Sequence, residues 1–258
     1  MRKILIFIFS LLISLPAGAQ FLDDATGLMQ MPSAEMNPSG TFMITNTFLN
    51  KHTLADRWGY NTFGYGFSLS LFSRVEVGYC MVIFDGKRHP NPTPRDTIMF
   101  NQDRHFSAKL LLLREGAFGI SWMPALAIGV SDPVTGSGGG EYIGSDVSGG
   151  TGNGFFNRNY IVATKHFQSS LGLISVHAGY QFNFRPDYRI NAPCAGIDWR
   201  PKWVQNEFCT LDLIAEYDSR TFNMGCIASI WHDHFEVMLE LQAMKWFSAG
   251  IRYKVVIK

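Results

Sequence analysis

Leu211-Asp212-Leu213-Ile214-Ala215-Glu216-Tyr217-Asp218 is the stretch of sequence that decides the fold. Acidic residues and apolar residues occupy alternate positions in it, with Ile214 as the one apolar exception on the acidic side. Successive side chains of a β-strand point to opposite faces, so the stretch predicts a strand with one polar and one apolar face. The same alternation recurs over residues 235–243 and 246–256, which indicates an all-β protein.

The whole chain follows this pattern without a linker or an internal repeat, which favours a single domain. We expect about twelve strands, with roughly 10–14 compatible with the pattern. The expected ranges are 40–49, 61–73, 75–84, 104–113, 118–130, 157–167, 171–182, 190–200, 208–217, 221–231, 235–243 and 246–256. A transmembrane β-barrel and a soluble sandwich or lipocalin-like barrel share this alternation, and they differ in which face is buried.

Three features favour a single antiparallel transmembrane β-barrel. The expected strands reach about ten residues, the length that a tilted strand needs to cross a bilayer. Short turns such as 73–74 alternate with long connections such as 85–103 and 131–156, as short periplasmic turns and longer extracellular loops do. Aromatic residues gather near strand ends, as at a membrane interface: Trp199, Tyr217, Trp231, Trp246, Phe247 and Tyr253.

The N-terminus has the features of a signal peptide. Arg2 and Lys3 precede an apolar run over residues 4–15, which is too short to span a bilayer. Ala17-Gly18-Ala19 then has the form of a cleavage site. We therefore expect residues 1–19 to be removed and the protein to be exported to the outer membrane of a Gram-negative cell.

Two further parts follow the expected cleavage site. Residues 20–39 are predicted to form a periplasmic N-terminal segment, and residues 40–258 to form the barrel. The segment contains Met31-Pro32-Ser33-Ala34, for which two interpretations remain open. It either folds into the lumen as a short plug or forms a capped turn before the first strand.

Charge is sparse in this chain, and the net charge is close to zero. Charged residues make up 17% of the sequence and the formal net charge is +1. Soluble domains usually contain about a quarter charged residues, and nucleic-acid binders are strongly basic. The composition therefore excludes a nucleic-acid partner, and it is consistent with a protein whose main contact is outer-membrane lipid.

The polar faces of the expected strands line the lumen if the apolar faces meet lipid. Charged residues of both signs are then expected inside: Glu76, Lys109, Lys165, Asp198, Arg200, Asp212, Glu216, Glu236, Glu240 and Arg252. His177 and Gln181 share this face. Because unpaired charges are costly in a narrow lumen, a structural salt-bridge network is favoured over a polar pathway for a solute. Lys165 is expected to pair with Glu216 or Asp198.

No motif predicts a catalytic, cofactor-binding or metal-binding residue. The Gly-rich stretch 136–154 is followed by an expected strand, whereas a phosphate-binding loop needs a helix there. His232-Asp233-His234 fits a solvated turn better than a metal site, because no third ligand is evident. Asp212 and Glu216 could act as an acid–base pair on a glycan, but packing charges are the favoured interpretation.

The four cysteines do not predict a metal site either. Their positions, 80, 194, 209 and 226, contain no C-x-x-C spacing. Export permits disulfides, and Cys194 and Cys209 lie on strands that are neighbours in sequence. A Cys194–Cys209 disulfide is therefore an open alternative to free thiols.

Four segments, in this order, resemble the YjbH-like family of exopolysaccharide-associated outer-membrane proteins. The first is GLMQMPSAEMNPSGTFMI, residues 27–44, before and within the first expected strand. The second is GGTGNGFFNRNYIVATKHF, residues 149–167, and the others are AGIDWRPK, residues 195–202, and LIAEYDS, residues 213–219. The resemblance spans most of the chain after the expected cleavage site.

The resemblance implies an outer-membrane barrel that assists export or assembly of an exopolysaccharide or capsule without an enzymatic step. Its implied partners are a polysaccharide and other export proteins, and no cofactor is implied. A general diffusion channel for small polar solutes is the alternative function. A hydrolase that uses Asp212 and Glu216 is the least favoured of the three.

Overall fold

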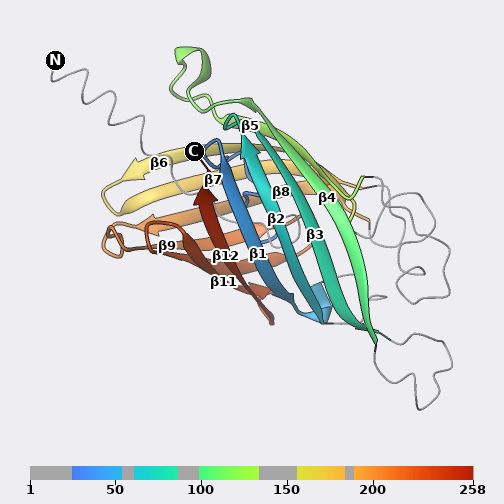
Figure 1. Ribbon diagram of the computed structural model, residues 1–258. Coiled ribbons are helices and arrows are strands. Elements are labelled where there is room, and N and C mark those ends of the chain that lie inside the picture. The colour runs from blue at the N-terminus through green and yellow to red at the C-terminus, as the bar shows by residue number, and fades with distance from the viewer. Residues whose placement is uncertain (1–24, 54–60, 87–98, 134–155, 184–188, 258) are drawn as a thin grey trace.

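The computed structural model describes residues 25–53, 61–86, 99–133, 156–183 and 189–257. Its strands form one closed antiparallel barrel, in which each strand pairs with its neighbours in sequence and β12 returns to β1 (Figure 1). The strands are β1 (Thr41–Leu49), β2 (Thr62–Leu71), β3 (Val75–Gly86), β4 (Met99–Leu113), β5 (Ala125–Ser131), β6 (Arg158–Ser169), β7 (Gly172–Phe182), β8 (Asn191–Pro201), β9 (Cys209–Tyr217), β10 (Phe222–Ile230), β11 (Phe235–Gln242) and β12 (Trp246–Val256). The prediction of a single twelve-stranded barrel is confirmed.

Two short 3-10 helices complete the described secondary structure. They are η1 (Lys51–Thr53) and η2 (Ala117–Gly119). Among the described residues, no helix is long and apolar enough to cross a membrane.

The barrel buries its polar face and exposes its apolar face. In β9, Asp212, Ile214 and Glu216 are buried, whereas Leu213 and Ala215 are exposed. Every strand pairs on both sides, so no sheet edge is left open. An apolar outer surface around a polar interior is the arrangement of a transmembrane barrel.

The barrel has two distinguishable ends. We name the end where β1 begins and β12 ends the near end, and the opposite end the far end. Successive strands meet in short turns at the near end, for example between β2 and β3 and between β6 and β7. Longer connections lie at the far end, for example between β3 and β4 and between β5 and β6. The predicted alternation of turns and loops thus holds for these connections, whereas the near-end connection between β4 and β5 is long and the far-end connections after β9 and β11 are short.

Two strand boundaries differ from the predicted ones. β5 begins at Ala125 rather than at residue 118, because η2 occupies the start of the predicted range. Gly116, Phe118 and Gly119 have positive φ there, and a left-handed backbone cannot continue a strand. β4 begins at Met99 rather than at residue 104, since its backbone pairs with β3 as far as Gly86. The other strands begin and end within two residues of their predicted limits.

Aromatic side chains lie outside the barrel close to both ends. At the near end Trp203 meets Trp199 edge-on, with ring centroids 5.2 Å apart, and Trp231 is exposed. At the far end Tyr217 and Phe222 lie 4.9 Å apart. Aromatic rings at these positions match the interfacial belts of membrane barrels.

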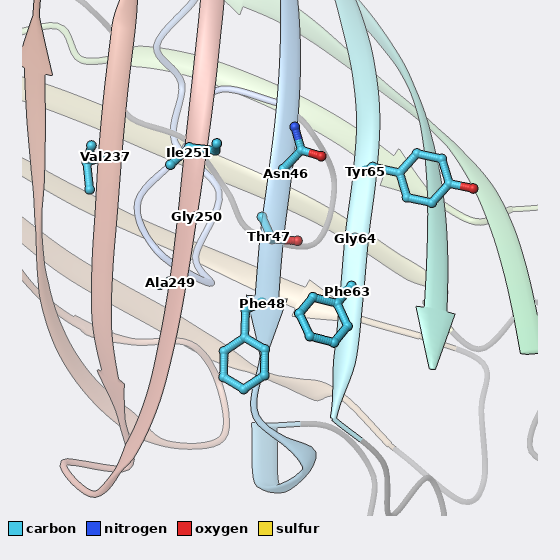
Figure 2. A pocket seen from close by; sticks show the side chains of 10 residues that line it. All are labelled: Asn46, Thr47, Phe48, Phe63, Gly64, Tyr65, Val237, Ala249, Gly250 and Ile251. Carbon is cyan, nitrogen blue, oxygen red and sulfur yellow. The ribbon is translucent and has the colours of Figure 1, made fainter. Parts of the chain in front are cut away.

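A groove of about 330 Å³ crosses the outer face where β1 meets β12 and β2 (Figure 2). Its walls include the outward-facing side chains of Phe48, Phe63 and Ile251. The groove therefore belongs to the apolar outer surface and is separate from the lumen.

Candidate functional site, a lumen closed by the N-terminal segment

The described residues before β1 fold into the barrel lumen, and we name residues 25–39 the plug. An antiparallel bridge joins Gly27 to Pro32, and the Leu28 N–H donates to the Met31 carbonyl at 2.8 Å. These contacts form a tight hairpin whose tip is Leu28 to Met31. Leu28, Met29 and Met31 are at most 2% exposed. Of the two arrangements left open by the sequence, the structure has the plug.

The hydrophobic core of the protein lies inside the lumen, between the plug and the wall. The plug contributes Leu28, Met29, Met31 and Ala34. The wall contributes Leu49, Leu111, Ala125, Ala127, Tyr160, Val162, Cys194, Ile214, Ile227 and Met238. Burial of a Leu or Met side chain stabilises a fold by roughly 1.5–3 kcal/mol. We name the part of the wall that surrounds the plug tip its seat, and Ile214, the apolar exception in the opening stretch, is one of the wall residues of this core.

Two lumen-facing glycines make room for the hairpin tip. A Cβ atom on Gly196 of β8 would collide with Leu28 and would lie 3.3 Å from the Met31 sulfur. A Cβ atom on Gly225 of β10 would lie 3.0 Å from the terminal carbon of Met29. The wall is therefore hollowed where the tip packs against it.

An ion pair clamps the plug at the near end. Lys109 of β4 lies 3.2 Å from Glu76 of β3, and both side chains are at most 1% exposed. Glu76 accepts hydrogen bonds from the backbone N–H groups of Thr26 and Asn37, at 3.0 and 3.1 Å. Lys109 donates to the carbonyls of Thr26 and Glu35, at 2.8 and 2.6 Å. Both ends of the hairpin are therefore held by one pair of charges.

The hairpin tip binds two carboxylates in the far half. Glu216 of β9 accepts hydrogen bonds from the backbone N–H groups of Met29, Gln30 and Met31, at 3.0, 2.7 and 3.3 Å. The Gln30 side chain donates to Glu240 of β11 at 2.8 Å. Consecutive backbone N–H groups around a carboxylate form the kind of nest that binds anions.

A relay of polar side chains contacts the plug from a third side. The Ala34 N–H donates to the Thr164 hydroxyl at 2.9 Å, and that hydroxyl lies 2.9 Å from His177 Nδ1. His177 Nε2 lies 2.9 Å from Asp198, which also accepts a hydrogen bond from Ser175. Three neighbouring strands, β6, β7 and β8, thereby hold Ala34 through one connected network.

A second network closes the near-end rim. Glu35 of the plug lies 2.9 Å from His166 Nε2, and Glu115 lies 2.5 Å from His166 Nδ1. Lys165 donates to Glu115 at 2.7 Å. Burial raises the pKa of the Glu115 carboxyl, but the hydrogen bonds from Lys165 and His166 outweigh it, and the pKa lies below its usual value.

The expected role of Lys165 is wrong in two respects. It has the parity of the outward-facing Ile161 and Phe167, so it does not line the lumen. Its partner is Glu115, on the turn between β4 and β5, and not Glu216 or Asp198. Glu115 lies between the strands predicted at 104–113 and 118–130. The sequence alone could not show that this turn lies beside β6.

The other expected lumen charges lie inside, and several of them form ion pairs. Arg200 binds Asp212 through two hydrogen bonds of 2.6 Å, a bidentate arrangement. Glu236 lies 3.1 Å from Arg252 and also pairs with Lys254. Together with Glu76, Lys109, Asp198, Glu216 and Glu240, these residues occupy the lumen wall.

Several residues of this site were missed by the sequence prediction. Arg158 of β6 donates to the Gln30 carbonyl at 2.5 Å, and it shares the inward parity of Thr164. Lys254 continues the polar face of β12 beyond Arg252. Parity could have added both residues to the lumen set. No sequence signal marked Gln30 or Glu35 as partners of the wall.

The remaining motifs do not form a site among the described residues. None of the four cysteines forms a disulfide. Cys194 lies in the far half of β8 and Cys209 at the near-end start of β9, so the alternative of a disulfide between them is wrong. His234 lies in a turn, where its Nδ1–H donates to the Lys254 carbonyl at 2.7 Å. No group of three or more potential metal ligands occurs in the described part of the chain.

The Gly-rich stretch 136–154 and the expected signal peptide, residues 1–19, lie outside the described residues. The structure therefore neither supports nor opposes those two predictions.

A family model described as "YjbH: Exopolysaccharide biosynthesis protein YbjH" matches residues 23–256. The chain belongs to the YjbH family. A comparison with curated proteins finds no match. Among solved structures, LpxR from Salmonella typhimurium has a TM-score of 0.43 and 9% identity, covering 84% of this chain and 100% of that one. The beta domain of the Bordetella autotransporter BrkA has a TM-score of 0.31 and 10% identity, covering 84% and 99%.

The segments that carry the resemblance to the YjbH family meet at the plug. Residues 27–44 are most of the hairpin and the start of β1. Residues 195–202 contain Gly196, and residues 213–219 contain Glu216, which both contact the tip. The described part of 149–167 contains Thr164, which binds Ala34. The four segments that resemble the family are far apart in sequence, and in the fold they contribute to the plug and its seat.

Proposed function

We propose that this protein is a non-enzymatic outer-membrane barrel that assists the export or assembly of an exopolysaccharide or capsule. The observation that carries the proposal is a YjbH-family chain whose own N-terminal segment is seated in the lumen. The apolar outer surface agrees with an outer-membrane location, with lipid as the immediate partner. A polysaccharide and other export proteins are the further partners that we propose.

The plug in the lumen favours the export or assembly function over that of a general diffusion channel. A porin-like channel keeps an aqueous lumen, whereas this lumen contains a packed core and paired charges. We therefore place the resting protein in a closed state. Single-channel recordings in planar bilayers test this: the wild-type protein is expected to stay closed, and a stable open pore would favour the diffusion channel.

The export or assembly function itself is tested by deletion of the gene in cells that make the polysaccharide. We expect less polysaccharide at the cell surface, because the polymer is either not made or stays inside the cell. Surface polysaccharide should recover when the full chain is restored. Unchanged surface polysaccharide, in cells shown to produce and localise the protein, would contradict the proposal. A restored chain with the exposed substitution Glu207→Gln serves as a control that should behave as wild type.

A further inference from the structure

Five acids of the lumen wall fall into two groups, according to whether a wall cation or the plug supplies their partners. In the near half, Glu76, Asp212 and Glu236 each pair with a lysine or arginine of the wall. In the far half, Glu216 and Glu240 receive donors from the plug, with Asn223 adding one hydrogen bond of 3.2 Å to Glu216. The near-half acids thus have cations in the wall itself, whereas the far-half acids have no described lysine or arginine of the wall among their hydrogen-bond donors and take most of those donors from the plug.

Glu216 and Glu240 form one site, because a single plug residue reaches both. The backbone N–H of Gln30 donates to Glu216 at 2.7 Å, and its side chain donates to Glu240 at 2.8 Å. The second oxygen of Glu240, Oε1, has no hydrogen-bond donor among the described residues, although Glu240 is only 1% exposed. A buried carboxylate oxygen without a donor is costly, and it indicates unused capacity for a ligand.

The wall around these acids is concave. Gly225 pairs with Glu240 across β10 and β11, and Gly196 pairs with Glu216 across β8 and β9. Both glycines face the lumen and leave the hollows that the plug tip fills. Two carboxylates beside two hollows would therefore face any molecule that replaced the tip.

The chemistry of the tip defines what could replace it. Every contact that the tip makes with the two carboxylates is an N–H donor. Hydroxyl and ammonium groups of a sugar are donors of the same kind, whereas a uronic acid adds a carboxylate that two acids would repel. Arg158 also contacts the tip, through the Gln30 carbonyl, and its contact with Gln181 of the wall remains when the tip leaves.

We propose that Glu216 and Glu240 form a binding site for a neutral or amino-bearing glycan, which the plug tip occupies in the resting state. This inference rests on the proposed function and names its substrate class. The plug then has two effects, since it closes the lumen and shields the acids. The donor groups of the glycan would occupy the positions that the N–H donors of the plug occupy in the resting state. Glycan binding therefore requires that the tip leave its seat.

The test uses full-length chains in which the tip is loosened and the two acids are intact. Gln30→Glu places a third carboxylate beside them, and Leu28→Asp removes the apolar contact with the Gly196 hollow. Folding is checked by the β-sheet circular dichroism signal. Block of single-channel current is then measured with glucosamine oligomers, glucose oligomers and galacturonic acid oligomers.

Glucosamine oligomers are expected to block at concentrations about tenfold or more below those of galacturonic acid oligomers, because like charges are disfavoured. Glucose oligomers should lie between them. Adding Glu216→Gln and Glu240→Gln on the same background should abolish this order. Adding Glu207→Gln and Asp233→Asn, which remove equal charge from near-end turns, should preserve it.

Three results would overturn the proposal. These are equal block by all three oligomers, an order that survives in the double amide, and folded variants that never conduct, which would mean that the tip is not exchangeable. None of them bears on whether the gene is needed for surface polysaccharide. The deletion experiment above therefore fails or succeeds independently of this site.

Discussion

The two halves of the lumen hold the plug by different means. At the near end, Glu76 and Lys109 form an ion pair with each other and hydrogen-bond to the backbone of both ends of the hairpin. At the far end, Glu216 and Glu240 depend on N–H donors that the plug itself supplies. The near end is thus an anchor that is part of the wall, and the far end is a seat that the plug completes.

This difference shows how one short segment can be both fixed and exchangeable. Removal of one partner of a buried ion pair strongly destabilises the folded state, whereas each single hydrogen bond contributes less to the free energy of unfolding. We therefore expect the tip to leave its seat more readily than the base of the hairpin leaves Glu76 and Lys109. The predictions below test this contrast from the largest effect to the smallest.

Lys109→Met should be the most damaging change. It leaves Glu76 charged and buried without its cation, which costs about 3–5 kcal/mol in the free energy of unfolding. Urea unfolding in lipid vesicles, followed by tryptophan fluorescence, measures this. A second change, Glu76→Gln, should recover part of the loss, and a loss for Lys109→Met below about 1 kcal/mol would contradict the anchor.

Glu216→Gln should weaken the far-end seat by a smaller amount. The amide turns one acceptor into a donor that faces the N–H groups of Met29, Gln30 and Met31, at a cost of about 1.5–3 kcal/mol. The same unfolding assay gives the value, and protease cleavage within the plug should become faster. Glu207→Gln, at an exposed turn, is the control, and equal effects of the two variants would refute the seat.

Gly196→Leu should push the tip out of its hollow. The new side chain takes the space of Leu28 and approaches Met31, and overpacking of this kind costs about 1–3 kcal/mol. Ala195→Leu is the matched control, because Ala195 faces outward on the same strand and should change stability by less than about 0.5 kcal/mol. If both variants unfold alike, the tip does not pack there.

Glu115→Gln should have the smallest effect, less than about 1 kcal/mol, because the rim network is partly exposed to water. The pKa of Glu115 is lowered from its ordinary value of 4.5. A lowered pKa in the folded state contributes stability above the unfolded value, and the contribution is lost as the pH falls through the folded value. Wild type and variant should therefore converge in stability as the pH falls from 4.5 through the lowered pKa of Glu115, and a difference that stays constant over this fall would argue against this network.

Parity was sufficient to predict much of the lumen wall. Asp212, Glu216, Glu236 and Arg252 lie inside because a strand has only two faces and one of them is apolar. Lys165 shows where parity fails. Its strand carries polar residues on both faces near the rim, so its direction could not be assigned, and its partner Glu115 comes from a turn.

The sequence by itself determined the barrel, its approximate strand limits and the polar character of its interior, because alternation is a local property of each strand. The tertiary structure alone decided that residues 25–39 fill that interior, since their contacts join positions up to 210 residues apart. The meaning of Ile214 illustrates the division. In sequence it is an exception to the alternation of Leu211 to Asp218. In the fold it is a lumen residue that belongs to the same hydrophobic core as the plug, because burial there depends on a distant segment.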